Sequence, residues 1–288
     1  MMLKRIVKLA LLEDIGKGDI TTTALIPSTL KGNAVIIAKE EGVLAGGNVA
    51  YEVFRSLDTE IRFEQVVPDG SKFKFGSILF NIEGKIAAMI TGERTALNFL
   101  QHLSGVATLT SKFVEKVAGT GVKIIDTRKT IPGLRGLEKY AVKCGGGENH
   151  RMGLWDMILI KDNHIMAAGG IKEAISKCKM QNAKCKTEVE VKSLDELDEV
   201  IKYPIDRVML DNMSITQIKE AVKKCKMQNA KCKIEVSGGV NLDNVREIAE
   251  AGVGYISVGA LTHSAPAIDI SLKVKNDIND KVKGGLKK

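Results

Sequence analysis

The chain contains 288 residues, of which 44% are hydrophobic, so it can bury a large core and form one barrel or a barrel with a small accessory domain. Its formal net charge is +8, but aromatic residues make up only 4% and no segment interleaves basic with stacking side chains. The charge therefore indicates a solvated surface and a polyanion site rather than nucleic-acid binding. No apolar run approaches the length of a membrane span.

Residues 1–12 are partly apolar, but Lys8 interrupts them and Glu13 and Asp14 follow directly. This pattern favours an amphipathic helix over a cleaved signal peptide. Five cysteines, an odd number in a chain without an export signal, favour reduced thiols over a disulfide framework. We therefore expect a cytoplasmic protein that does not bind a membrane.

The N-terminal third of the chain alternates strand and turn signals. A loop at residues 16–22 could cap the next element, and strands are predicted at residues 32–38 and 61–67, with a helix at residues 49–57 between them. Closely spaced hairpin signals follow. Strands that cluster before a run of βα units predict a separate N-terminal domain, and a helix beginning at Gly92 is expected to lead into the next one.

Short apolar runs then recur, separated by polar segments of helix length. They lie at residues 122–125, 157–160, 188–191, 207–210, 234–236 and 255–258. This recurrence predicts at least six parallel strands and a closed barrel. Polar residues or glycines end or follow each run, as expected for the active face of a barrel. They are Thr127, Arg128, Lys129, Lys161, Asp162, Glu190, Asp211, Ser237, Gly238, Gly239, Gly259 and Ala260.

Cations are concentrated around the first two of these runs. Arg128 and Lys129 follow the first run, Lys161 follows the second, and His150 with Arg151 comes after three glycines between them. The glycines are expected to let the backbone approach a ligand closely. Guanidinium groups recognise planar carboxylates through paired hydrogen bonds, so the sequence predicts a site for a small polyanion.

Three motifs in this region resemble the quinolinate phosphoribosyltransferase family, also called nicotinate-nucleotide pyrophosphorylase (carboxylating). They are Asp126-Thr-Arg-Lys-Thr-Ile-Pro-Gly-Leu-Arg135, Gly145-Gly-Gly-Glu-Asn-His-Arg151 and Leu159-Ile-Lys-Asp-Asn-His164. The resemblance extends to residues 13–22, 92–98 and 235–240, so it covers nearly the whole chain. It implies an α/β fold with an incomplete TIM-like barrel of six or seven parallel strands and an N-terminal α+β open-faced sandwich.

The resemblance also implies domain limits and a reaction. The sandwich would span residues 1–108 and the barrel residues 109–265, while residues 266–288 would return to the sandwich. The enzyme would transfer phosphoribose from 5-phosphoribosyl 1-pyrophosphate to quinolinate with decarboxylation. Nicotinate mononucleotide, pyrophosphate and CO2 would be formed, in de novo NAD biosynthesis.

By the same resemblance, the quinolinate pocket is expected to contain Arg128, Lys129, His150, Arg151 and Lys161. Arg94 would be inserted from the partner subunit of a homodimer, with further assembly left open. Beside the two carboxylates of such a ligand, His150 is expected to have its protonated form favoured.

For the second substrate, the resemblance places Glu190 and Asp211 at the ribose and at Mg2+, with Lys129 as a third catalytic residue. Glu188 is the alternative acid on its strand, on the same pleat face but deeper in the barrel. Loops after the last two strands are expected to bind the 5′-phosphate through backbone amides. These loops contain Ser237, Gly238, Gly239, Gly259 and Ala260, with His263 nearby in either a ligand-binding or a structural role.

The decapeptide Lys-Cys-Lys-Met-Gln-Asn-Ala-Lys-Cys-Lys occurs twice, at residues 177–186 and 224–233, each time just before a predicted strand. The cysteine spacing is not a usual zinc spacing, so two similar helix-to-strand connections are favoured over a metal site. Residues 281–288, rich in lysine, are expected to be frayed.

Three other functions remain open on the sequence. A paralogous phosphoribosyltransferase of the type associated with molybdate transport would act on another aromatic acid. A Schiff-base lyase would use Lys129 or Lys161 as its nucleophile, although the crowding of other cations favours an anion pocket. A non-catalytic metabolite-binding protein would have little use for the acid pair Glu190 and Asp211.

Overall fold

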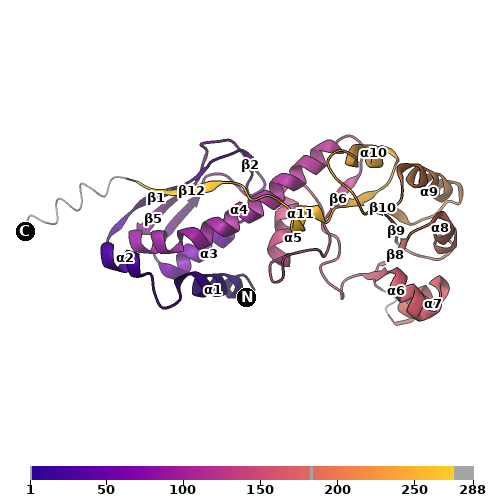
Figure 1. Cartoon of the computed structure of the whole chain (residues 1–288), viewed down its shortest axis with the longest axis horizontal. Coiled ribbons are helices and arrows are strands. Elements are labelled where there is room, and N and C mark those ends of the chain that lie inside the picture. Colours follow the sequence, from indigo (N-terminus) through magenta and orange to yellow (C-terminus); the bar gives the residue numbers. More distant parts are fainter. Residues whose placement is uncertain (1, 182–183, 276–288) are drawn as a thin grey trace, which may run out of the picture. The chain divides into compact units, whose positions relative to one another are not determined.

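The computed structural model describes residues 2–181 and 184–275 (Figure 1). They divide into two compact units, residues 2–108 with 265–275 and residues 109–264, which are described separately. Among the described helices, none combines the length and the apolar character needed to cross a bilayer. Residues 281–288, which were expected to be frayed, lie outside the described residues.

The first unit is built on an antiparallel sheet whose strand order is β12-β1-β5-β3. Its strands and a separate short pair are β1 (Lys31–Ala38), β2 (Gly42–Val43), β3 (Arg62–Gln65), β4 (Lys72–Phe73), β5 (Ile78–Lys85) and β12 (Ile270–Val274). Its helices are α1 (Met2–Ile15), α2 (Ile20–Leu25), α3 (Gly47–Leu57) and the first part of α4 (Ile86–Lys116). β12, from the end of the described chain, pairs with β1.

Local sequence explains the main elements of this unit. Asp19 caps α2 by accepting a hydrogen bond from the backbone N–H of Thr22 at 2.9 Å, as the loop prediction anticipated. Helix α3 packs on the sheet through Phe54, whose ring lies 6.0 Å from that of Phe63 on β3. Phe63 in turn contacts Phe80 on β5, with ring centroids 4.8 Å apart. These rings join helix and sheet in one core.

Helix α4 begins at Ile86 and not at Gly92, so the predicted start was wrong by nearly two turns. Gly92 does not begin the helix; it is an interior residue of α4 at a close contact with α3. A Cβ atom there would come within 3.0 Å of Leu57 and 3.2 Å of Phe54, both on α3. The missing side chain therefore lets α4 approach α3 closely, which offsets the cost of glycine in a helix.

The second unit contains six parallel strands in the order β6-β11-β10-β9-β8-β7. They are β6 (Lys123–Ile125), β7 (Ile158–Ile160), β8 (Thr187–Val191), β9 (Arg207–Asp211), β10 (Lys233–Ser237) and β11 (Tyr255–Ser257). The intervening helices, several of which Figure 1 shows beside the sheet, are α5 (Arg135–Cys144), α6 (Asp162–Ala168), α7 (Ile171–Gln181), α8 (Leu194–Val200), α9 (Ile215–Met227), α10 (Val245–Glu250) and α11 (Ala260–His263).

All six predicted strands are confirmed, and the unit has the mixed α/β fold with a parallel six-stranded sheet that was expected. The prediction of a closed barrel was wrong for the described residues. β6 and β7 are the two ends of the strand order, and no hydrogen-bonded ladder joins them. Each of these strands has only three residues, so little edge is available for pairing.

Both copies of the duplicated decapeptide lie in helix-to-strand connections, as predicted. The first leads from α7 toward β8, with residues 182–183 outside the described part, and the second leads from α9 into β10. In the described part of the chain, no disulfide involves any of the five cysteines.

Candidate active site

A cavity of about 690 Å³ in the second unit lies at the carboxyl ends of the parallel strands. Twelve of the thirteen predicted site residues line it: Arg128, Lys129, His150, Arg151, Lys161, Glu190, Asp211, Ser237, Gly238, Gly239, Gly259 and Ala260. The remaining one, Arg94, is exposed on α4 in the first unit. The strand-end argument therefore located the cavity, while the prediction for Arg94 concerns a second copy of the chain.

Strand register explains why the acids share one face of the sheet. Glu190 on β8 lies opposite Met209 on β9, and Met209 lies opposite Glu235 on β10. Side chains two residues apart on a strand point to the same face, so Asp211 and Ser237, which also pair with each other, face the same way. The sequence thus directs oxygen ligands from three neighbouring strands into one cavity.

The two acids predicted to bind metal have short contacts at the strand ends. Glu190 Oε2 accepts a hydrogen bond from Lys161 Nζ at 2.7 Å, and the side chain of Glu190 is 9% exposed. Asp211 accepts a hydrogen bond from Asn212 Nδ2 at 2.9 Å. Carboxylate oxygens at the mouth of a cavity are the ligands that Mg2+ prefers. The donor set therefore fits that ion.

The cations occupy the part of the cavity that follows β6 and the glycine-rich loop. Arg128 and Lys129 are exposed, whereas Arg151 is buried and donates a hydrogen bond from Nη1 to the carbonyl of Met157 at 3.2 Å. Burial lowers the pKa of the Arg151 guanidinium, and the charge of Arg128 acts in the same direction. An anion in the cavity would relieve this repulsion between like charges.

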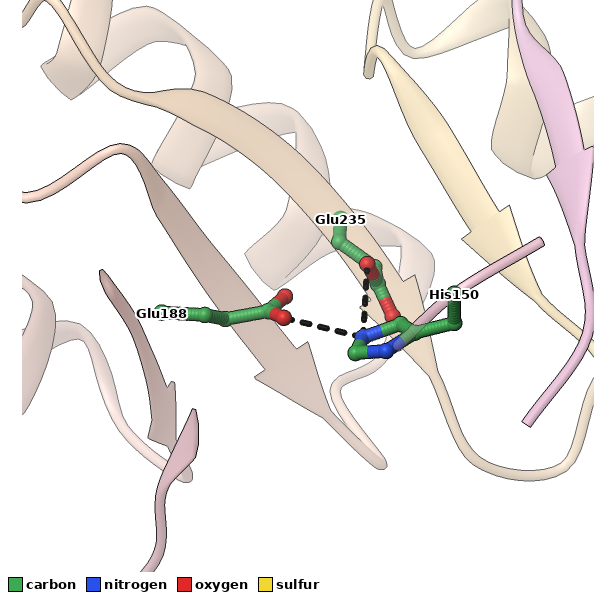
Figure 2. Close-up of side chains that lie close together, drawn as sticks. All are labelled: His150, Glu188 and Glu235. Carbon is green, nitrogen blue, oxygen red and sulfur yellow. Dashed lines mark ion pairs between the residues drawn. The ribbon is translucent and has the colours of Figure 1, made fainter. Parts of the chain in front are cut away.

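Below the exposed cations, His150 lies between two buried carboxylates, as Figure 2 shows. Its Nε2 atom is 2.9 Å from Glu188 Oε2 and 3.6 Å from Glu235 Oε2, and its side chain is 6% exposed. Nδ1 accepts a hydrogen bond from the backbone N–H of Arg151 at 2.7 Å, so the ring proton lies on Nε2. The approach to Glu188 is outside hydrogen-bond geometry, which leaves Nε2 unsatisfied within the described residues.

Protonation in this cluster is set mainly by burial. Burial lowers the pKa of His150, against the opposing effect of Glu235. Burial also raises the pKa of Glu188, and burial together with the charge of Glu188 raises the pKa of Glu235 to about 7. In the unliganded protein, desolvation therefore outweighs the nearby carboxylates, while the prediction that His150 is protonated concerns the complex with a dicarboxylate ligand.

Arg207 compensates part of the buried negative charge. Its Nη1 atom lies 2.6 Å from Glu235 Oε2, and its guanidinium lies 4.0 Å from the ring centroid of Tyr255. Sequence reasoning missed both Arg207 and Glu235. Glu235 had a usable signal, because it is two residues before Ser237 and therefore on the same pleat face. Glu188 is fully buried and deeper than Glu190, as predicted.

A second buried ion pair holds the loop that contains His150. Lys139 on α5 forms an ion pair with Asp126, and both side chains are 0% exposed. Lys139 also donates to the carbonyl of His150 at 3.0 Å, while Asp126 accepts from the backbone N–H of His150 at 2.9 Å. Burial raises the pKa of Asp126 to about 6, against the effect of Lys139. This pair, which sequence reasoning also missed, fixes the His150 backbone from both sides.

Of the glycines at residues 145–147, Gly147 has a different role from the one predicted. A Cβ atom at Gly147 would come within 2.8 Å of Thr110 and Val142, so that glycine allows contact with helices and not with a ligand. Gly259 does approach the site, since a Cβ atom there would lie 2.9 Å from Lys129 Cδ. Gly238 has a φ of +91°, and a Cβ atom would lie 2.2 Å from Asn212 Oδ1.

Comparison with known proteins gives a consistent family. Residues 19–104 match the model of the quinolinate phosphoribosyl transferase N-terminal domain, and residues 106–273 match that of the C-terminal domain. The chain is 41% identical to nicotinate-nucleotide pyrophosphorylase [carboxylating] of Mycobacterium leprae, covering 92% of this chain and 95% of that protein. It is also 41% identical to the chloroplastic protein of the same name from Arabidopsis thaliana, covering 96% of this chain and 84% of that protein.

Solved structures agree with this result. The nicotinate-nucleotide pyrophosphorylase from Francisella tularensis matches with a TM-score of 0.90 and 43% identity, covering 95% of this chain and 96% of that one. NadC from Streptococcus pyogenes matches with a TM-score of 0.89 and 39% identity, covering 94% and 96%. With both family domains matched in order, and with a cavity that unites the cations and acids of the sequence motifs, the chain belongs to the quinolinate phosphoribosyl transferase family.

Proposed function

We propose that this chain transfers phosphoribose from 5-phosphoribosyl 1-pyrophosphate to quinolinate with decarboxylation, releasing nicotinate mononucleotide, pyrophosphate and CO2. The observation that carries the proposal is a single cavity lined both by the cations Arg128, Lys129, Arg151 and Lys161 and by the acids Glu190 and Asp211. A planar dicarboxylate requires the cations, and a ribose with its pyrophosphate requires the acids. The names of the related proteins support this substrate pair over another aromatic acid.

Arg128 and Arg151 bind the carboxylates of the acceptor in this proposal, and Lys161 is a further cation in the same cavity. His150 contributes a ring edge held in place by Glu188 and by the backbone of Arg151. Arg151 is positioned in advance by its bond to the Met157 carbonyl, so little conformational freedom is lost on binding.

Glu190 and Asp211, which line the same cavity, would hold Mg2+ and the ribose hydroxyls. When bound, the ion would neutralise charge on the pyrophosphate. Lys161 Nζ contacts Glu190 in the unliganded protein, so substrate binding would release this lysine from the acid. The backbone at Ser237, Gly238 and Gly259 offers N–H groups to the 5′-phosphate.

Lys129 stabilises the departing pyrophosphate as the ribose acquires oxocarbenium character, and the pyridine nitrogen of quinolinate then attacks the anomeric carbon. Thr262 supports this lysine, because its hydroxyl donates to the Lys129 carbonyl at 2.7 Å. The protein acts mainly by positioning two anionic reactants and by screening their charges.

We further propose a homodimer in which Arg94 enters the partner's cavity, and a cytoplasmic location. Exposure of Arg94 on α4 leaves its guanidinium accessible to a second chain. The absence of a disulfide among the described cysteines is compatible with a reducing compartment.

Two substitutions test which residues bind quinolinate and which bind phosphoribosyl pyrophosphate. Arg128→Ala should raise the KM for quinolinate by at least about tenfold, the effect of losing one charged hydrogen-bonding group, while the KM for phosphoribosyl pyrophosphate changes little. Asp211→Ala should give the opposite pattern and a weaker response to magnesium. Steady-state kinetics with each substrate varied in turn would measure both. If the two variants showed the reverse pattern, the assignment of Arg128 to quinolinate and of Asp211 to phosphoribosyl pyrophosphate would be wrong.

A further inference from the structure

A second cavity, of about 660 Å³, lies at the opposite ends of the strands from the candidate active site. It is bordered by residues at the amino ends of β6, β10 and β11, including Lys123, Lys233 and Tyr255. Cys225 and Cys232, from the second copy of the duplicated decapeptide, both line it. The proposed reaction uses neither cysteine.

Local backbone geometry brings the two thiols together. Helix α9 ends at Met227, and Asn229 then takes a left-handed conformation with a φ of +51°. The N–H of Ala230 donates to the carbonyl of Cys225 at 2.9 Å, which closes the end of the helix. The chain thereby turns back before β10, so that Cys225 and Cys232 line the same cavity and influence each other's ionisation.

The two thiols of this pair differ in burial and in acidity. Cys225 is 5% exposed, and its pKa is raised by the hydrogen bond to Cys232 and further by burial and by the charge of Asp198. Cys232 is only half-buried, and the hydrogen bond from Cys225 lowers its pKa to about 7. Because the thiolate is the nucleophilic form, Cys232 is the reactive member and Cys225 is a protonated neighbour within reach.

We propose that Cys225 and Cys232 are a reversible disulfide site, oxidised by hydrogen peroxide that enters through this second cavity. The Cys232 thiolate attacks a peroxide oxygen, forms a sulfenic acid and, with one proton taken up, releases water. The Cys225 sulfur then attacks the sulfenic sulfur, the S–S bond forms, and the hydroxyl leaves as a second water with the proton of Cys225. Two electrons pass from the thiols to the peroxide, and a dithiol reductant reverses the change.

The first copy of the decapeptide is a control supplied by the chain itself. Cys178 and Cys185 have the same neighbours in sequence, but Cys178 lies on α7 and Cys185 follows it, and residues 182–183 between them are outside the described part. Any difference in oxidation between the copies therefore arises from folded structure and not from local sequence.

The test treats the full chain with limiting hydrogen peroxide at neutral pH, blocks remaining thiols by alkylation, and cleaves after glutamate. Cleavage gives two distinguishable peptides, residues 174–188 and 221–235, each with both cysteines of one copy. The second peptide should lose two hydrogens several-fold faster than the first, because the lowered pKa of Cys232 raises its thiolate fraction at neutral pH and because Cys225 lines the same cavity. Equal rates in the two peptides, or sulfenic acid without a disulfide at Cys232, would overturn the proposal.

Single substitutions separate the two roles. Cys225→Ser keeps a hydroxyl donor beside Cys232, so the variant should accumulate a sulfenic acid at Cys232 that dimedone traps, with no disulfide in that peptide. Cys232→Ser should leave Cys225 unmodified under the same conditions. Cys185→Ser is the matched control and should not alter oxidation of residues 221–235. Rapid oxidation of Cys225 in the Cys232→Ser variant would contradict the assigned roles.

Discussion

In the interior of the second unit, the protonation of single residues depends on their burial and on their neighbours in space, and not on distance along the sequence. Glu188 and Glu235 are both 0% exposed, and Arg207 is the cation that contacts Glu235. Their chemistry was only partly predictable. The alternation of strand residues identifies which side chains face inward, but which pairs touch depends on the register between strands, and sequence alone did not fix it. Lys139 gave no signal, since a lysine on an amphipathic helix is usually exposed.

Glu235 should make stability depend on pH. Its folded-state pKa is raised to about 7 from the usual 4.5, so the folded chain holds more protons than the unfolded chain between these values. Its contribution to the free energy of unfolding is therefore largest below pH 4.5 and is lost as the pH rises toward 7. Glu235→Gln should flatten that decline in urea denaturation curves measured across this range. An unchanged pH slope would contradict it, and Glu220→Gln, at an exposed position, is the control.

At the scale of elements, the six strands of the second unit could be predicted because each is a short apolar run bounded by glycine or polar residues. The start of α4 could not, because nothing in the local sequence shows that Gly92 packs against Leu57. Gly147 was misassigned for the same reason, since a glycine required by a helix contact and one required by a ligand look alike in sequence.

Helix α11 should be sensitive to one methyl group added at Gly259, the residue that precedes it. Gly259→Ala would place Cβ 2.9 Å from Lys129 Cδ and 3.2 Å from the ring of His263. Lys129 is flexible, so the fold should persist with a nearly unchanged melting temperature, while kcat/KM for phosphoribosyl pyrophosphate falls about tenfold because the lysine is displaced. Gly136→Ala, which has open space around it on α5, should leave the kinetics unchanged and not lower the melting temperature, since alanine favours a helix over glycine. Wild-type kinetics in Gly259→Ala would show that Lys129 does not need this approach.

At the scale of the whole molecule, we propose that a second chain completes the active site. Twelve predicted residues share one cavity, whereas Arg94 lies on an exposed surface of α4. Sequence motifs identify this arginine but cannot state which chain's cavity it serves. The answer depends on assembly, which local sequence patterns do not encode.

Subunit mixing resolves this question. Arg94→Ala and Asp211→Ala should each be nearly inactive, but dissociating and reassembling them together should restore about one quarter of wild-type activity. Half of the dimers formed at random contain both variants, and each of these has one site with both native residues. If Arg94 served its own chain, every site would lack one residue and the mixture would stay inactive. Mixing Arg94→Ala with Arg128→Ala provides a matched repeat when it is assayed at a quinolinate concentration far below the raised KM of Arg128→Ala.

In the proposed reaction, one cavity carries out both phosphoribosyl transfer and decarboxylation. Release of CO2 from carboxyl-labelled quinolinate tests this proposal most directly. With phosphoribosyl pyrophosphate and magnesium present, the wild-type chain should release label in step with the appearance of nicotinate mononucleotide, and Arg128→Ala should release far less. Omitting either the second substrate or magnesium should abolish release. A folded wild-type protein that forms no labelled CO2 under these conditions would contradict the proposed function.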